Sequence, residues 1–460
     1  MMQAKKKVLW SQHLASGTLS IVLFTVGLGN GWSSPYLAKL SMMDNIDGIP
    51  RASDDELLWV ASLMNIGRIF GAVAGAVAQD TIGRKMGLFF CGFPMLSGWI
   101  CIAMATSVHW LYAARILCGF SMGIVWTTMS HYLAEIADPQ IRGSLVLWNI
   151  TVQSVGIFVG NLMGPYMSMK LFAYISIFAT LMFLVLFPLI PDSPHRHLKM
   201  GNLDKAEESL KWFRRKQDVK QELNEIKDYL SKSDASFKEK LDEFRQKQSL
   251  KNFGLMFLMN VFLYFCAFNV INNYMEIIVS ASRVTIIAPS TLVSINGFFA
   301  IISGLVATFL VDSFGRRFLL IVSSLGMAMS LTSLGIHFML LKCHYDPVSL
   351  NLLPCICLTG YTLSYSAGMG CIPSTLVGEL FSPNLKSVAS LMFSGTAALF
   401  STLSTITFLP LQNLIGPSYL YWFYSAGIYA SSAYYYFCLT ETKGQSLQSI
   451  QIRQKKEAES

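Results

Sequence analysis

The hexapeptide Asp80-Thr81-Ile82-Gly83-Arg84-Lys85 returns 232 residues later as Asp312-Ser313-Phe314-Gly315-Arg316-Arg317. Each copy places an acid three residues before a glycine and two basic residues directly after that glycine. Each copy also follows a long apolar stretch, and the spacing is about half of the 460-residue chain. Two copies of one motif at matching places predict a chain made of two related halves.

The apolar stretches around these motifs are too long for a soluble protein. The chain is 53% apolar and 13% charged, with a mean hydropathy of +0.47, whereas soluble domains carry about 25% charged residues. Asp, Glu, Lys and Arg are absent from four stretches: 16–38, 143–169, 284–311 and 387–440. Because about 18 apolar residues in a row predict a membrane span, the composition excludes a soluble enzyme, a secreted disulfide scaffold and a disordered chain.

Cutting the sequence at charges and turn residues predicts twelve membrane-spanning helices. They lie near 16–38, 57–79, 86–106, 110–134, 143–167, 171–190, 255–279, 286–311, 318–341, 350–378, 387–410 and 417–438. Long apolar runs favour helices over a β-barrel, whose strands would be short and would alternate in polarity. The predicted fold is an all-α membrane protein with two pseudo-symmetric bundles of six transmembrane helices.

One charged stretch divides the predicted spans six and six. It carries helically spaced apolar positions such as Ala206 and Leu210 among many charges, which predicts short amphipathic helices on the cytoplasmic face. The predicted parts are an N-terminal bundle over 1–190, this loop over 191–253, a C-terminal bundle over 254–440 and a cytoplasmic tail over 441–460.

Basic residues in short loops predict the orientation of the spans. The richer side holds Lys5, Lys6, Lys7, Arg84, Lys85, Arg142, Arg316, Arg317, Lys386 and Lys443. That side is predicted to be cytoplasmic and to carry both termini, and the plasma membrane is the expected location. The net charge of +8 then reflects topology and contact with the lipid bilayer. Neither a nucleic-acid partner nor an obligate protein partner is expected.

A second repeated pattern, an acid followed seven residues later by a base, occurs after the fourth and tenth predicted helices. Glu135 precedes Arg142 by seven residues, and Glu379 precedes Lys386 by seven. Such acids and bases can pair across the cytoplasmic seam between the bundles when that side is closed and separate when it opens. The alternative is that these charges only hold the loops at the interface. The match of both loops and both pairs favours the gating hypothesis.

The two hexapeptides resemble the D-x-x-G-R-[RK] motif that the sugar-porter family of the major facilitator superfamily carries in both halves. Further matches are Arg115, Gly119 and Gly123 (R-x-x-x-G-x-x-x-G), Tyr132 and Glu135 (Y-x-x-E), Arg142 and Gly143 (R-G), Pro191-Asp192-Ser193-Pro194 (for P-E-S-P) and Glu441-Thr442-Lys443-Gly444 (E-T-K-G). Gly31-Trp32-Ser33-Ser34-Pro35 looks most like the insect facilitated trehalose transporter branch. The resemblance implies a two-bundle carrier gated by Asp80, Gly83, Arg84, Lys85, Arg115, Glu135, Arg142, Asp312, Gly315, Arg316, Arg317, Glu379 and Lys386.

The resemblance fails at the positions where the family binds sugar. The family's fifth-helix glutamine falls on Ile150, and its seventh-helix Q-Q-x-S-G-x-N keeps only the last residue, Asn269. The tenth-helix tryptophan is replaced by Ser374, and the eleventh-helix N-W pair falls on Ala397-Ala398. Because lost amide partners leave sugar hydroxyls unpaired, the hexose site that the resemblance implies is largely absent.

Polar residues that remain in the fifth and seventh predicted helices are candidates for a repositioned solute site. They are Asn149, Gln153, Asn269, Asn272, Asn273 and Tyr274. Amides are costly in hydrocarbon unless they meet a partner or a watery cavity, and the alternative is hydrogen bonding between packed helices. Arg68, mid-span in the second helix, is a candidate anchor for an anionic solute; a structural ion pair or a side chain that extends to the headgroups would also account for it.

These observations predict a carrier that moves a sugar or polyol by alternating access. Facilitated diffusion is favoured over proton symport because no acid lies mid-span in the first six predicted helices. Two alternatives stay open: a carrier of a non-sugar solute such as an organic anion, and a transport-incompetent relative that acts as a sensor. An enzyme is not expected, and no metal, cofactor or catalytic residue is predicted, since the sequence has no metal-ligand spacing, nucleophile motif or phosphate loop.

Overall fold

The computed structural model describes residues 2–138, 141–233, 243–370, 372–381, 385–439 and 441, and they are mostly helical. The first half contains α1 (Met2–Gly31), α2 (Ser33–Met42), α3 (Asp54–Thr81), α4 (Arg84–Ala103), α5 (Val108–Ile136), α6 (Arg142–Met163), α7 (Met169–Leu186) and the 3₁₀ turn η1 (Phe187–Leu189). The connecting segment contains α8 (Pro194–Lys199), α9 (Leu203–Arg214) and α10 (Lys220–Ser233). The second half contains α12 (Lys247–Phe265), α13 (Phe268–Ala281), α14 (Pro289–Phe314), α15 (Arg316–Lys342), α16 (Leu352–Ser364), the π-helical turn η2 (Tyr365–Met369), α17 (Ile372–Leu380), α18 (Lys386–Ile415) and α19 (Pro417–Cys438).

The helices account for all twelve predicted spans. In the described part of the chain, ten helical segments are long and apolar enough to cross a membrane, with α1–α2 and α12–α13 each counting as one broken span. The tenth predicted span is α16–η2–α17, which the π turn interrupts, and the twelfth is α19, whose many tyrosines and serines lower its hydropathy. Most spans begin and end within a few residues of the predicted positions. The exceptions are α1, which begins at Met2 and not near 16, and α12, which begins at Lys247, before the predicted boundary at 254.

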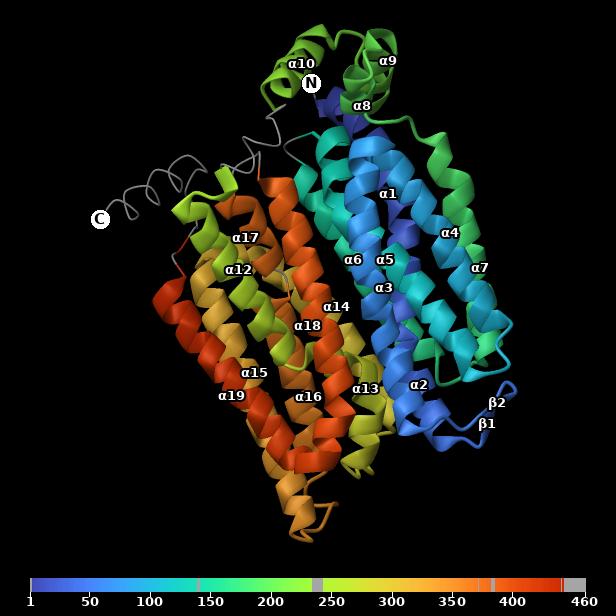
Figure 1. Ribbon diagram of the computed structural model, residues 1–460, viewed down its shortest axis with the longest axis vertical. Helices are drawn as coiled ribbons and strands as arrows, with labels where there is room; N and C mark the ends of the chain where they lie inside the picture. The colour runs from blue at the N-terminus through green and yellow to red at the C-terminus, as the bar shows by residue number, and fades with distance from the viewer. Residues whose placement is uncertain are drawn as a thin grey trace.

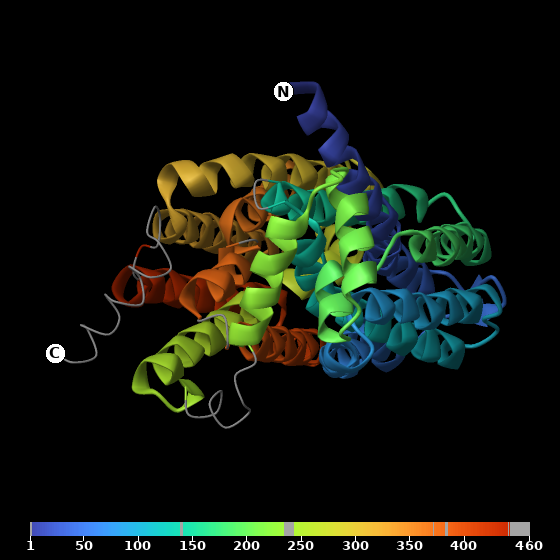
Figure 2. The ribbon, with the colours of Figure 1, turned by 90° about the horizontal axis from the view of Figure 1, so that it is seen from above.

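Figure 1 shows the two halves side by side, α1–α7 in blue to green and α12–α19 in yellow-green to red. We call the end that carries α8–α10 the basic end, because the loops with Arg84 and Arg316 lie there. The opposite end, which we call the hairpin end, carries β1 (Asn45–Ile46) and β2 (Ile49–Pro50), an antiparallel pair around Asp47-Gly48. Figure 2 looks down on the basic end, where α8–α10 lie over the helices. The halves meet where α2 packs on α13, α3 on α18 and α6 on α14.

The connecting segment forms three short helices, of which α8 and α9 pack on the first half and α10 packs on α8 and α9. Ala206, Leu210 and Phe213 on α9 are fully buried. The Phe213 carbonyl accepts hydrogen bonds from Ser11 Oγ and Gln12 Nε2 of α1, both at 3.2 Å. The α9 helix therefore holds the N-terminal end of the first span in place.

Lipid-facing surfaces are recognisable by their large exposed apolar side chains. Phe178 on α7, Phe309 on α14 and Phe437 on α19 are each more than two-thirds exposed. A soluble protein seldom exposes apolar surface on this scale, whereas a bilayer solvates such side chains.

Small residues set the spacing of the helix pairs. At Gly119 on α5, a Cβ would collide with the Met64 carbonyl of α3, and at Gly71 on α3 it would collide with the Phe120 carbonyl of α5. Close backbone approach at glycines is the usual way for helices to gain contact in a bilayer, where no hydrophobic effect drives them together.

This packing predicts that Gly119→Val lowers thermal stability. Forcing α3 and α5 apart should cost about 1–3 kcal/mol, as overpacking of a core does, and so lower the unfolding temperature by several degrees. The measurement is thermal unfolding of the purified protein in detergent. Gly427→Val on α19 is the matched control, because open space surrounds Gly427. Equal losses in the two variants would contradict the proposed role of Gly119.

Candidate functional site

The first span breaks at Trp32, between α1 and α2, and Arg115 of α5 holds the break together. Arg115 is 2% exposed, and its guanidinium donates to the Gly29 carbonyl at 2.8 Å and to the Val60 carbonyl of α3 at 3.1 Å. It also donates to Ser33 Oγ and lies 4.6 Å from the Trp32 ring centroid. Arg115 was predicted among the gating residues. It lies near the hairpin end of α5, away from the loops of the basic end, and its described contacts are with the helix break and α3; a gating role for Arg115 stays a prediction.

The seventh span breaks at Ala267, between α12 and α13, and a residue of the tenth span holds this break. Ala267 takes a left-handed conformation, with φ at 67°. The Cys266 carbonyl, freed by the break, accepts a hydrogen bond from the Tyr361 hydroxyl of α16 at 3.0 Å. The Phe268 ring stacks on Tyr365 of η2, so the π turn packs directly against the break.

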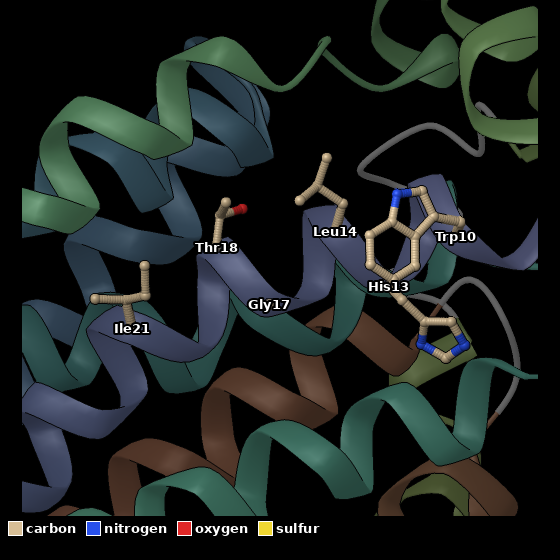
Figure 3. Close-up of a pocket in the computed structure, with 6 residues that line it drawn as sticks. All are labelled: Trp10, His13, Leu14, Gly17, Thr18 and Ile21. Carbon is tan, nitrogen blue, oxygen red and sulfur yellow. The ribbon is translucent and has the colours of Figure 1, made fainter.

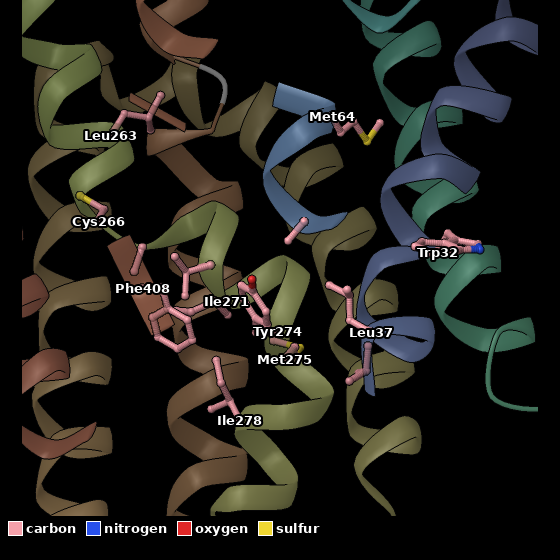
Figure 4. Close-up of a cluster of buried hydrophobic side chains, with 14 of the residues drawn as sticks. Trp32, Leu37, Met64, Leu263, Cys266, Ile271, Tyr274, Met275, Ile278 and Phe408 are labelled. Carbon is pink, nitrogen blue, oxygen red and sulfur yellow. The ribbon is translucent and has the colours of Figure 1, made fainter. Parts of the chain in front are cut away.

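Both broken spans bring apolar side chains to the centre of the molecule. Figure 4 shows Leu37 of α2 and Met64 of α3 opposite Tyr274 and Met275 of α13, within one buried cluster. The Tyr274 ring lies 5.2 Å from Phe408 of α18. The predicted site residues are therefore set in a mostly apolar surrounding, where each unpaired polar atom is costly.

Two candidate amides on α6 lie one turn apart but in different situations. Asn149 is fully buried, and its Nδ2 donates to Ser16 Oγ at 2.7 Å and to the Leu145 carbonyl at 2.9 Å. Its Oδ1 accepts from Ser20 Oγ at 3.1 Å. Asn149 is thus occupied by packing between α1 and α6. Gln153 Oε1, in contrast, is buried without a hydrogen-bond partner among the described residues.

The candidates on α13 are brought together by the helix itself. Asn269 and Asn272 are half-buried, and Asn273 is 8% exposed. The described part of the chain offers no hydrogen-bond partner to Asn269 Nδ2 or to the hydroxyl of Tyr274. These groups remain candidates for a solute or for water.

The structure adds polar groups that the sequence patterns did not single out. Asn296 Oδ1 on α14 and the hydroxyls of Ser401 and Ser404 on α18 are buried without partners in the part of the chain that is described. These polar residues belong to no sequence motif, so the sequence alone did not identify them. Asn296 becomes a candidate only because α14 packs on α6 and α13. Arg68 on α3 is half-buried, and its Nε likewise lacks a described partner.

The two repeated loops have the same backbone geometry. Gly83 has φ and ψ of 90° and 162°, and Gly315 has 90° and 163°. The Arg196 side chain lies over Gly83 and the Glu441 carboxylate over Gly315, so neither position has room for a Cβ. Glu441 accepts hydrogen bonds from the backbone of Arg316 at 2.9 Å and of Arg317 at 3.0 Å. An anion at a helix N-terminus is favourable.

The second base of each loop ties the start of one helix to the end of the sixth span in its own half. Lys85 donates to the Pro188 and Ile190 carbonyls after α7. Arg317 donates to the Tyr436 carbonyl of α19 and lies 5.3 Å from that tyrosine's ring centroid.

The predicted gating residues were expected to pair across the seam between the halves, but the ion pair that the described residues form lies within one half. Arg84 pairs with Glu135 inside the first half, because the start of α4 and the end of α5 are neighbours at the basic end. Asp80 and Arg142 are exposed. The side chains of Asp312, Glu379 and Lys386 lie outside the described part of the chain, so their pairing across the seam stays a prediction.

Comparison with known proteins agrees with this architecture. The family model described as “Sugar (and other) transporter” matches residues 19–453. The chain belongs to the sugar transporter family. It is 28% identical to the facilitated trehalose transporter Tret1 of Bombyx mori, over 98% of this chain and 88% of the relative, and 29% identical to Tret1 of Apis mellifera ligustica, over 96% and 88%. The fold is that of the E. coli xylose transporter XylE in a partially occluded inward open conformation, with a TM-score of 0.78 and 19% identity over 95% of this chain and 99% of XylE.

These matches confirm the predicted fold class, the predicted family and the predicted class of function, a multi-pass membrane carrier of the sugar transporter family.

The hollow drawn in Figure 3 does not lie between the two halves. All six of its lining residues lie on α1: Trp10, His13, Leu14, Gly17, Thr18 and Ile21. A site between the halves must use residues of both, so this hollow of about 250 Å³ is not the candidate solute site.

His195 on α8 lies among positive charges at the basic end, and it should make the stability of the protein depend on pH. Its Nδ1 is buried without a described partner. Burial, and then the positive charges of Arg84, Arg142, Arg214 and Lys199, lower the pKa of His195 to about 4. In the unfolded chain this pKa returns to about 6.5. The unfolded state therefore binds more protons between these values, and stability falls as the pH drops from about 6.5 to 4.

We expect His195→Gln to reduce this acid-induced loss of stability. The measurement is the unfolding temperature in detergent at pH values from 7.5 to 4.5. His344→Gln at the exposed hairpin end is the control and should leave the pH slope unchanged. A His195→Gln variant with the parent's slope would show that the histidine is not held neutral by its surroundings.

Proposed function

We propose that this protein carries a sugar or polyol by alternating access between its two six-helix halves, 1–190 and 254–440. The observation that supports this most directly is the set of neutral polar atoms left unpaired along the series α6–α14–α13: Gln153 Oε1, Asn296 Oδ1 and Asn269 Nδ2. Buried polar atoms without partners require water or a ligand. Amides both donate and accept hydrogen bonds, so they suit a solute rich in hydroxyl groups.

The proposed orientation places the basic end in the cytoplasm of a plasma-membrane carrier. The short loops at that end carry Arg84, Lys85, Arg142, Arg316 and Arg317. The positive-inside rule favours this arrangement.

Transport without proton coupling is the mechanism we propose. Glu135, the acid at the end of the fourth span, is paired with Arg84, and the first, third, fifth and sixth spans contain no Asp or Glu. Glu276 of the seventh span lies five residues before the end of α13, away from the middle of the span. A carrier that couples to protons needs a membrane acid that changes its protonation state. Downhill exchange of the solute needs none.

The names of the relatives make trehalose the first solute to test. Several positions where the family binds hexose are substituted in this chain, whereas the amide oxygens of Gln153 on α6 and Asn296 on α14 are unpaired within the described part of the chain. A disaccharide or a polyol fits this repositioned set of donors and acceptors.

A second candidate is an organic anion, and Arg68 is the observation that favours it. Its Nε is buried without a partner in the described part of the chain. An unpaired cation in a span is costly, and an anionic solute would offset that cost.

The function is tested by counterflow in liposomes that contain the purified protein. We expect labelled trehalose or a polyol to exchange down its gradient, with no accumulation above equilibrium when an inward proton gradient is imposed. Accumulation driven by protons would contradict facilitated diffusion. Exchange of labelled organic anions only, abolished by Arg68→Ala, would establish the second candidate. No exchange of any solute would favour a sensor.

The contrast between Gln153 and Asn149 predicts two different defects. Gln153→Ala removes an unpaired acceptor and should raise the KM for the transported solute up to about tenfold, since a net hydrogen bond contributes about 0.5–1.5 kcal/mol. Its unfolding temperature should stay near the parent's. Asn149→Ala removes the donor to the buried Ser16 hydroxyl, at a cost of about 1–3 kcal/mol, whereas Ser20 keeps its bond to the Ser16 carbonyl. The variant should lower the unfolding temperature while leaving KM unchanged. The reverse assignment of the two defects would contradict the proposed site.

A further inference from the structure

Trp126 on α5 carries an indole ring that the surrounding packing does not fully cover. The residue is partly exposed, yet its Nε1 is buried and has no hydrogen-bond partner among the described residues. A buried indole N–H normally donates to a partner. This position therefore keeps bonding capacity for a ligand.

Two other tryptophans of the first half show the case of complete packing. Trp32 is fully buried, with its ring centroid 5.2 Å from that of Tyr36. Trp99 is also fully buried, with its ring centroid 5.8 Å from that of Phe172. Their Nε1 atoms lack partners in the described ranges as well, so an unpaired donor alone does not indicate a ligand. Trp126 differs because part of its ring stays open and no described aromatic side chain stacks on it.

The open part of the Trp126 ring faces the second half. Trp126 follows Met122 by four residues and Arg115 by eleven, so the three share one face of α5. Arg115 on that face bonds carbonyls of α1 and α3. The first span continues as α2, which packs on α13, and α3 packs on α18; α5 itself also contacts α18. Met122 belongs to the buried cluster of Figure 4, which joins the two halves, and Trp126 packs against it.

Trp126 and the candidate amide Gln153 lie at similar depth in the first half. Gln153 is at the middle of α6 (Arg142–Met163), and Trp126 is about one turn from the middle of α5 (Val108–Ile136). These two helices contact each other, and α6 packs on α14 of the second half. An aromatic ring and an amide on adjacent helices can therefore serve one solute.

We propose that Trp126 is the aromatic surface on which the solute stacks. The indole ring covers the C–H face of a pyranose, and Nε1 donates to a hydroxyl at the rim of the same sugar ring. An indole suits this solute because it combines an apolar body with one donor at its edge. A linear polyol has no fixed apolar face and gains less from such a surface. The inference rests on the proposed carrier function and narrows its solute to a sugar with a closed ring.

The test compares a ring sugar with a linear polyol in variants of Trp126. Counterflow of labelled trehalose and of labelled mannitol is measured in liposomes that contain the full-length protein. We expect Trp126→Ala to raise the KM for trehalose roughly tenfold or more, because the apolar contact and the hydrogen bond are both lost. The KM for mannitol should rise about threefold at most. Trp126→Phe keeps an aromatic face without the donor and should raise both KM values about threefold.

Trp99→Phe is the matched control for these variants. Trp99 also has an Nε1 without a described partner, but its ring is enclosed in the core of the first half. The control should therefore leave both KM values at those of the parent.

Binding is measured separately, as the rise in unfolding temperature that trehalose or glucose causes in the purified protein in detergent. A parent that binds and exchanges trehalose, with the same KM in monodisperse Trp126 variants, would overturn the role of Trp126 and leave the carrier in place. Sugar binding that requires Trp126, without exchange of any solute, would support the aromatic surface and reject only the proposed transport. A parent that neither binds nor exchanges either ring sugar would overturn the aromatic surface, whatever polyols and anions do.

Discussion

A backbone carbonyl that a helix break releases inside a membrane must find a donor, and this constraint shapes both halves of the protein. No water in the bilayer core can replace the lost bond, which would cost several kcal/mol. The first half meets the constraint with the guanidinium of Arg115, which binds the Gly29 carbonyl. The second half meets it with the hydroxyl of Tyr361, which binds the Cys266 carbonyl. The donors come from the fourth and tenth spans, which are equivalent in the two halves, so one architectural solution is carried out by two different chemistries.

The repeated loops at the basic end show the same relation between backbone and side chain. Gly83 and Gly315 share one conformation to within a degree, yet a cation covers the first and an anion covers the second. The bases that follow are used within each half, since Lys85 and Arg317 hold the ends of the sixth and twelfth spans. The motif therefore builds a rigid corner in each half. Any contact it makes across the seam is added to that structural role.

Polar groups in the membrane divide into those that packing satisfies and those that it leaves unpaired. Asn149 makes three hydrogen bonds within the first half, whereas the Oε1 of Gln153, one turn further along α6, makes none in the described part of the chain. The two residues are the same in kind and nearly the same in depth, so only the neighbours on α1 separate a packing residue from a candidate ligand. A carrier needs groups of the second kind, because a solute can bind only where bonding capacity remains.

The number of spans, most of their approximate limits and the division into two halves could be read from the sequence. Each of these follows from local apolarity, charge and spacing, which a bilayer enforces within single segments. The contacts of Arg115 at a helix break, the pairing of Arg84 with Glu135 within one half and the Oδ1 of Asn296, unpaired among the described residues, could not be read in this way. They depend on which side chains meet after segments far apart in the chain have packed together, and the single sequence carries no local signal for such meetings.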